Sequence, residues 1–198
     1  LLAGQGLTFR VYPVVDMEFP ASVHDCEGWL ITGSRHGAYE DHPFIKPLEA
    51  FIREAYAEAV PMVGICFGHQ VIAQALGGRV EKFTGGWQVG PTRYRMDDGE
   101  LTLNAWHQDQ VVEKPVEAEV AGSSPFCENA ALVYGDWAYT VQAHPEFDNE
   151  FLAALILARG KGLVPDRLLA EAEAALALPI DQAAMARQIA DFFKKPRN

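Results

Sequence analysis

Short apolar runs alternate with helical patterns through the first half of the chain, and this alternation restricts the fold most strongly. Strands are predicted over 28–32 and 60–65. Between them, apolar side chains recur at helical spacing after Pro43, and a second helix is predicted over 68–76. Strands separated by helices pair in parallel, because the connecting helix returns the chain across one face of the sheet. We therefore expect an α/β fold in three layers, with a mostly parallel central sheet flanked by helices.

The remaining segments are predicted to add further strands and helices to this core. Antiparallel strands are expected in the middle of the chain, over 92–96, 101–105, 116–120 and 131–134, because short alternating runs are separated there by turn signals. Further strands are predicted over 7–15 and 139–143, and helices over 149–159, 166–178 and 181–195, the last two with Asp caps. The opening Leu1-Leu2-Ala3-Gly4 resembles the end of a helix, so the first strand of the sheet is expected to be missing at the N-terminus. We expect one domain over 1–198, with the helices of 166–195 packed on its body.

Composition narrows the possible partners. The chain carries 16 basic and 27 acidic residues, a formal charge of −11, which argues against nucleic acid because phosphate binding depends on Lys and Arg. A run of 18 apolar residues is absent from the sequence, so no membrane partner is expected. Three cysteines are too few for a disulfide framework and no secretory signal is visible. These features predict a reducing compartment, the cytoplasm.

A candidate nucleophile lies where the second strand meets its helix. Gly64-Ile65-Cys66-Phe67-Gly68 has the spacing of a sharp strand-to-helix turn, in which flanking glycines relieve crowding of the backbone. The helix N-terminus favours a thiolate at Cys66, and the Phe67 N–H could stabilise an oxyanion. The alternative for Cys66 alone is a buried structural thiol.

A nucleophilic thiol needs a base, and two histidines are candidates. His69 follows Cys66 on the same helix, where packing or lining the pocket is the favoured role. His144 ends an apolar strand, and Glu146 two residues later could orient its ring. The alternative for His144-Pro145-Glu146 is a plain loop at the end of a strand.

The segments Gly64-Ile65-Cys66-Phe67-Gly68-His69-Gln70 and Val141-Gln142-Ala143-His144-Pro145-Glu146 together resemble the class I glutamine amidotransferase family. The likeness is greatest to stand-alone members related to the glutaminase domain of GMP synthase. The resemblance implies an α/β sheet and a triad in which Cys66 is the nucleophile, His144 the base and acid, and Glu146 the orienting carboxylate.

Other positions match the family less closely. Thr32-Gly33-Ser34-Arg35 resembles a glycine-rich turn, and this implies that the Ser34 N–H completes an oxyanion hole beside Phe67. Ser34 and Arg35 depart from the Gly-Gly-Pro that the family usually has there. The resemblance also implies substrate contacts, which would come from Gly33, Gln70, His107 and Asp109. An exposed turn is the alternative for the segment Trp106–Asp109.

The resemblance implies hydrolysis of the glutamine side-chain amide through a γ-glutamyl thioester, with release of ammonia to an acceptor, without cofactor or metal. His24-Asp25-Cys26 offers too few ligands to indicate a metal, and a surface position is favoured. No synthetase segment is visible, so a separate synthetase subunit is a possible partner. Two alternatives stay open: a γ-glutamyl peptidase or hydrolase on the same scaffold, and a non-catalytic regulatory module.

Overall fold

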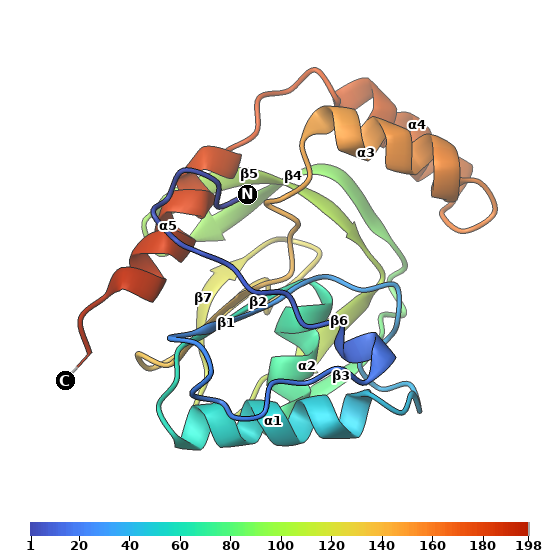
Figure 1. The fold of residues 1–198 in the computed structure, drawn as a ribbon. Coiled ribbons are helices and arrows are strands. Elements are labelled where there is room, and N and C mark those ends of the chain that lie inside the picture. Colours follow the sequence, from blue (N-terminus) through green and yellow to red (C-terminus); the bar gives the residue numbers. More distant parts are fainter. Residues whose placement is uncertain (198) are drawn as a thin grey trace.

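The computed structural model describes residues 1–197, which form a central sheet of seven strands. Three strands pair in parallel at one end of the sheet: β1 (Trp29–Ile31), β2 (Met62–Ile65) and β9 (Ala138–Val141). The sheet continues through antiparallel pairs, in the order β8 (Ala131–Tyr134), β7 (Glu119–Ser123), β4 (Gln88–Met96) and β5 (Gly99–His107). The expected α/β class, with antiparallel strands added to a parallel core, is confirmed (Figure 1).

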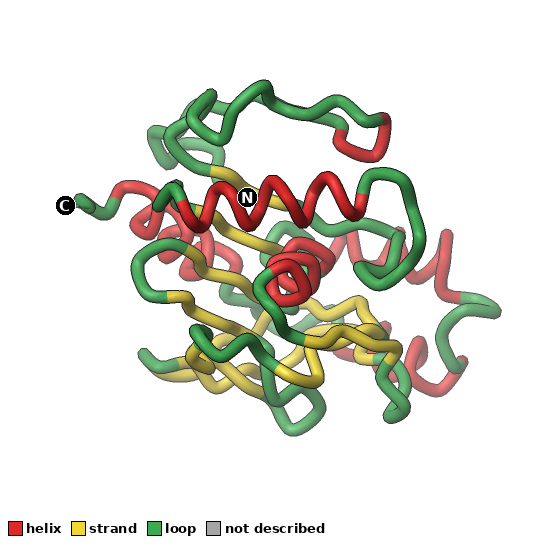
Figure 2. The backbone as a smooth tube through the Cα atoms, turned by 90° about the horizontal axis from the view of Figure 1, so that it is seen from below, coloured by secondary structure: helices red, strands yellow, loops and turns green. Residues whose placement is uncertain are grey.

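Helices cover both faces of the sheet (Figures 1 and 2). On one face lie α1 (Ile45–Ala57) and α2 (Phe67–Ala75), and on the other lies α5 (Gln182–Lys194). Strand β2 shows the alternation that makes this possible, because Met62 packs in the α1–α2 core while Val63 and Ile65 pack in the α5 core. Both faces of β2 are therefore buried. A side chain of this segment can reach solvent only where the strand ends, after Ile65.

A separate group of helices packs on the antiparallel half of the sheet. It consists of α3 (Asn149–Leu155), a π-helical turn (Ile156–Gly160) and α4 (Asp166–Ala175). Leu152, Ile156 and Val164 form a small core with Val89 of β4. A Cβ on Gly90 would lie 3.0 Å from the Cβ of Ala172, so α4 sits close against β4. Among the described helices, none has the length and apolar character needed to cross a membrane.

The predicted strand over 7–15 is wrong. This stretch is extended but pairs with no strand, and it ends in a short 3-10 helix, Val14–Asp16. Its apolar side chains divide between two roles: Tyr12 packs on Trp29 with ring centroids 5.8 Å apart, whereas Val11 is 84% exposed. Tyr12 and Val14 therefore pack on the α1–α2 core, and the stretch takes no part in backbone pairing.

The sequence prediction missed two strands, β3 (Arg79–Lys82) and β6 (Asp109–Glu113), which form a separate antiparallel pair. Arg79 and Glu113 pair across it at 2.7 Å, so charged side chains occupy positions that a search for alternating apolar runs passes over. The predicted strand at 116–120 begins later, at Glu119, because Val116 is 94% exposed in the preceding turn.

The expected Asp caps are also wrong. Asp166 is the first residue of α4, whose N-cap is Pro165. Asp181 occupies the N-cap position of α5 but makes no side-chain cap. Its carboxylate accepts the Thr102 N–H at 2.7 Å, and its own N–H donates to the Thr102 carbonyl. Asp181 thus fastens the start of α5 to β5 instead of capping the helix.

Candidate active site

Cys66 lies in a strained turn between β2 and α2. Its φ of 50° and ψ of −103° are unusual for a residue with a side chain. The flanking glycines are required by close contact, because a Cβ on Gly64 would lie 2.5 Å from the Gly68 carbonyl, and one on Gly68 would lie 2.0 Å from the Ile31 oxygen. The Cys66 N–H donates to the Val141 carbonyl at 2.8 Å, which ties the turn to β9. The sulfur is thereby held at the carboxyl end of the parallel strands.

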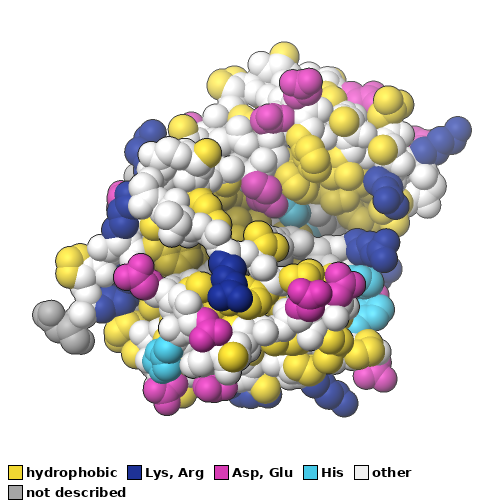
Figure 3. All heavy atoms as spheres, in the orientation of Figure 1, with side chains coloured by type: hydrophobic (Ala, Val, Ile, Leu, Met, Phe, Trp, Pro, Cys, Tyr) yellow, Lys and Arg dark blue, Asp and Glu magenta, His cyan; other side chains and the backbone are white. Residues whose placement is uncertain are grey.

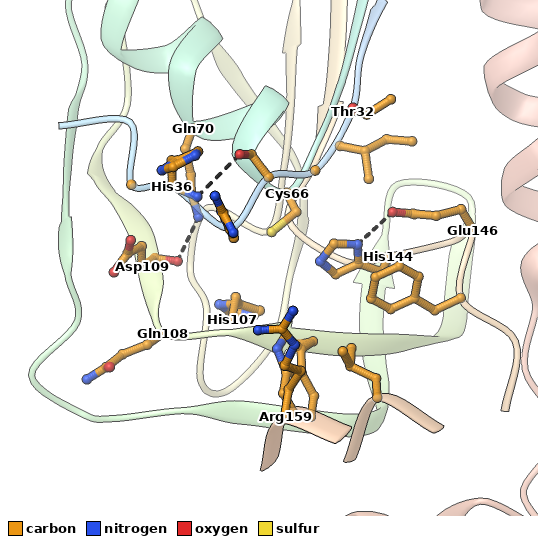
Figure 4. A pocket seen from close by; sticks show the side chains of 18 of the residues that line it. Thr32, His36, Cys66, Gln70, His107, Gln108, Asp109, His144, Glu146 and Arg159 are labelled. Carbon is orange, nitrogen blue, oxygen red and sulfur yellow. Dashed lines mark hydrogen bonds and ion pairs between the residues drawn. The ribbon is translucent and has the colours of Figure 1, made fainter. Parts of the chain in front are cut away.

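His144 reaches the same point from the end of β9. Its ring and the Cys66 sulfur point toward each other across the cavity (Figure 4). The His144 Nδ1 lies 2.7 Å from the Glu146 carboxylate, which fixes the ring orientation and leaves Nε2 available toward the sulfur. Asn104 accepts the His144 N–H at 2.8 Å, and the Phe147 ring stacks on the imidazole at 4.0 Å. The structure therefore brings Cys66, His144 and Glu146 together from distant parts of the sequence.

The charge environment of His144 favours a protonated ring. Burial lowers its pKa, but the nearby Cys66 sulfur and the hydrogen bonds to Cys66 and Glu146 outweigh burial. The net effect raises the pKa of His144 well above its ordinary value. An imidazole that retains a proton beside a sulfur can deliver that proton to a leaving group.

His69 faces away from this chemistry. It is completely buried, and its Nδ1 lies 2.8 Å from the Thr140 hydroxyl oxygen. Burial lowers the pKa of His69 to about 3, so the ring stays neutral near pH 7. This places His69 in the packing role that the sequence favoured, although it does not line the cavity.

The expected oxyanion donors lie on two sides of the nucleophile. Phe67 begins α2 directly after Cys66, and Ser34 follows β1 in the neighbouring loop. Within residues 1–197, neither of these two backbone N–H groups donates to a protein acceptor. Gly33 lies against the imidazole, since a Cβ there would come within 2.9 Å of the His144 ring. A side chain at position 33 would therefore displace the imidazole.

Gln142 is a neighbour of the sulfur to which the sequence analysis assigned no role. Its side-chain amide N–H group lies 3.6 Å from the Cys66 sulfur, and it is fully buried. Its carbonyl oxygen accepts from the Gln70 amide at 3.1 Å, and the same Gln70 amide donates to the Asp109 carbonyl at 2.9 Å. The Gln70 amide nitrogen, expected to contact substrate, is thus already engaged by the protein. The sequence did carry one signal for Gln142: it is a polar residue within the apolar run before His144.

A cavity of about 770 Å³ opens above the sulfur. Cys66, His144 and Glu146 lie on one side of it, together with Gly33 and Ser34. A second part of the lining comes from the antiparallel half and its helical cover, and we call it the far side: Trp87, Trp106, Leu155, Leu163 and Arg159. Figure 3 shows one face of the molecule, with a hollow near its centre. Hydrophobic side chains lie within the hollow and charged side chains lie around it. The Cys66 sulfur is therefore reachable by a small molecule.

His107 and Asp109 also line the cavity, but not from an exposed turn. His107 ends β5 and Asp109 begins β6, so only Gln108 separates two strands. His107 is buried, and burial followed by the charge of nearby His144 lowers its pKa to about 3. Within residues 1–197 neither of its ring nitrogens has a hydrogen-bond partner.

Asp109 is half-buried and has a protein partner. Its carboxylate accepts the Tyr39 hydroxyl at 3.1 Å, and burial raises its pKa. Figure 4 places Asp109 and Gln108 across the cavity from Glu146. The cavity therefore offers a neutral imidazole and a carboxylate to a ligand.

Known proteins resemble the chain in both sequence and fold. The family described as glutamine amidotransferase class-I matches residues 7–159. A glutamine amidotransferase-like protein of Schizosaccharomyces pombe is 32% identical over 174 residues, which cover 82% of this chain and 70% of that protein. Gamma-glutamyl peptidase 2 of Arabidopsis thaliana is 30% identical over 166 residues, covering 77% of this chain and 67% of the relative.

A solved glutamine amidotransferase from Methylobacillus flagellatus has the same fold, with a TM-score of 0.79 at 24% identity over 98% of this chain and 85% of its own. GMP synthases are also among the relatives in sequence. The family expected from the two motifs is confirmed. The chain therefore belongs to the class I glutamine amidotransferase family.

Proposed function

We propose that the protein hydrolyses the side-chain amide of glutamine, or of a γ-glutamyl compound, through a thioester on Cys66. The observation that carries this proposal is the meeting of a strained, cavity-facing Cys66 with the His144–Glu146 pair. A merely structural thiol needs neither a sharp turn nor an oriented imidazole beside it.

In the first half-reaction, the Cys66 sulfur attacks the amide carbon and forms a C–S bond. The oxyanion accepts hydrogen bonds from the Ser34 and Phe67 N–H groups, each contributing about 3–4 kcal/mol in comparable sites. His144 gives its proton to the amide nitrogen as the C–N bond breaks. The amine leaves, as ammonia from glutamine, and the γ-glutamyl thioester remains on Cys66.

In the second half-reaction, water attacks the thioester carbon and His144 accepts a proton from that water. The C–S bond breaks, glutamate leaves, and the sulfur and imidazole return to their starting states. Glu146 holds the imidazole in position through both steps. The steps use no cofactor or metal.

A second substrate class is supported by the size of the cavity. About 770 Å³ lies in the range of drug-sized ligands, roughly 300–1,000 Å³. The cavity, which reaches Arg159 on its far side, is larger than ammonia needs as a leaving group. We therefore keep as the second candidate a γ-glutamyl compound with a larger leaving group, the class in which the Arabidopsis relative is named.

The deciding experiment is a product screen. Purified protein is incubated with glutamine and, separately, with γ-glutamyl dipeptides, and glutamate, ammonia and free amine are measured. Release of glutamate from either substrate by the native protein, and its loss in Cys66→Ser, is the expected result. Glutamate release from neither substrate would favour a non-catalytic regulatory module.

If ammonia is the product, an acceptor must use it, and we propose a separate synthetase subunit as the partner. GMP synthase relatives support this idea, because those synthases are named as glutamine-hydrolysing. We also propose a cytoplasmic location, because the three cysteines are free and a reducing compartment keeps thiols in that state. Co-purification from cell extract, followed by fractionation, tests both.

A further inference from the structure

Three metal-binding side chains converge at the edge of the cavity, in the loop between β1 and α1. The side chains are those of His36, Glu40 and His42, whose donor atoms all lie within 4.8 Å of one another. The Glu40 carboxylate oxygen lies 2.8 Å from His42 Nε2 and 3.8 Å from His36 Nδ1. None of the three has a role in the proposed reaction.

The two imidazoles are held together by a buried ring. Their centroids are 4.2 Å apart, and both pack on Phe44, which His42 meets in a stacked arrangement at 5.8 Å. The Gly37 N–H donates to Glu40 at 3.1 Å and orients its carboxylate. The packing on Phe44 and the Gly37 hydrogen bond thus hold all three donor groups close together before any ligand binds.

We propose that His36, Glu40 and His42 form a binding site for a zinc ion. Two imidazoles and one carboxylate are a donor set that zinc prefers, at about 2.0–2.2 Å from each donor. Donors around a tetrahedral ion lie roughly 3.3 Å apart. All three side chains are partly exposed, with fractions of 22%, 45% and 36%, so rotations can bring their donor atoms to that spacing.

The site is separate from the triad but borders the same cavity. His36 and Glu40 line the cavity, and Figure 4 shows His36 on the side of Cys66 away from His144. Arg35 precedes His36, and its charge opposes that of a cation, which limits the affinity. Zinc would join both ends of the segment that follows Ser34, and so would restrain one wall of the cavity.

The test measures zinc binding by calorimetry in Cys66→Ser protein, because the native sulfur and His144 would themselves bind zinc. Two variants remove a ligand: Glu40→Gln, which keeps an oxygen for the Gly37 N–H, and His42→Phe, which keeps a ring against Phe44. His24→Ala is the matched control, because His24 lies 3.5 Å from Glu58, an exposed pair to which the described residues add no third donor.

We expect one zinc per chain, with affinity reduced roughly 10–100-fold or more in both ligand variants and unchanged in His24→Ala. Cobalt bound to Cys66→Ser protein should give the intense visible absorption of a four-coordinate ion, and this readout does not depend on the folding of either ligand variant. Absence of saturable zinc binding would overturn the proposal, as would equal affinity in the ligand variants and the control. A six-coordinate cobalt spectrum would also overturn it. Because binding is the readout, failure here leaves the proposed hydrolysis untouched.

Discussion

The two sides of the cavity are built in different ways. The reactive side comes from two short segments, 62–68 and 141–146, whose backbone contacts leave almost no freedom: Gly68 touches the Ile31 carbonyl and Cys66 is tied to Val141. The far side is assembled from a strand junction at Gln108 and a π-helical turn that carries Arg159. The first is fixed by close backbone contacts around a tight turn. The second depends on side-chain packing between elements that are distant in the sequence.

In the proposed function, the first side carries out the reaction and the far side selects the substrate. Changes on the reactive side should abolish turnover whatever the substrate is, because every substrate needs the same sulfur and imidazole. Changes on the far side should alter which amine is released and leave the attack on the amide intact. Each prediction below tests one part of this division.

The largest effect on turnover is expected for substitution of His144, and substitution of His69 is the comparison. His144→Ala should lower kcat/KM by about 10⁴-fold or more, because it removes the proton donor and acceptor of both half-reactions. His69→Ala should leave a measurable rate, since His69 is turned toward Thr140 and not toward the sulfur. Steady-state kinetics on both variants, with circular dichroism to verify folding, makes the comparison. Loss of turnover in His69→Ala with retention in His144→Ala would reverse the assignment.

The next effect concerns the turn itself. Gly68→Ala should reduce the free energy of unfolding by roughly 3 kcal/mol or more, because the new Cβ would lie 2.0 Å from a backbone oxygen. Gly77→Ala is the control. Unlike Gly68, Gly77 has a positive φ, of 96°, but no atom lies within 4 Å of the new Cβ, so a loss of only about 1 kcal/mol, from backbone strain alone, is expected. Urea unfolding measures both, and equal losses would mean that crowding at the turn is unimportant.

Two buried histidines predict acid sensitivity. Burial lowers the pKa of His69 and of His107 to about 3, from 6.5. Between these pH values the unfolded chain binds protons that the folded chain does not, so stability is fully present above pH 6.5 and falls as the pH is lowered. Each residue should contribute a slope of about 1.4 kcal/mol per pH unit. Urea unfolding of His69→Gln and His107→Gln between pH 7 and pH 5 should show a shallower slope than the native protein, and an unchanged slope in both would contradict these shifts.

The smallest effect tests the far side. If γ-glutamyl compounds with an acidic leaving group are substrates, Arg159→Ala should lower kcat/KM for a γ-glutamyl dipeptide about tenfold, because it removes a charge-assisted contact. Glutamine hydrolysis by the same variant should change little. Parallel kinetics on both substrates is the measurement. An equal loss on glutamine would show that Arg159 supports the reactive side and not the leaving group.

The sharp turn at Cys66 and the contact of His144 with Glu146 could be predicted because their signals lie within a few residues of sequence. Two glycines around Cys66 imply a sharp turn, and the structure shows that each of them is sterically required. The pairing of His144 with Glu146 follows from a spacing of two residues at the end of a strand. Stereochemistry within a few residues is the kind of information that a single sequence carries.

The rest depends on contacts between distant segments. The residues of 7–15 have strand composition but no strand beside them, and Asp181 has the position of a cap but binds Thr102 instead. Gln142 could be identified as a neighbour of Cys66 only after β9 had been placed beside β2. The sequence indicated His107 and Asp109 in the cavity wall but not Leu155 or Arg159, because the last two reach the cavity only in the folded chain.

Direct detection of the covalent intermediate tests the central claim. The protein is mixed with glutamine or a γ-glutamyl dipeptide, quenched in acid within the first turnover, digested and examined by mass spectrometry. We predict one γ-glutamyl group on the peptide that contains Cys66, and its accumulation in a His144→Ala variant supplied with an activated γ-glutamyl thioester. Turnover without any adduct on Cys66, or undiminished turnover in Cys66→Ser, would contradict the account.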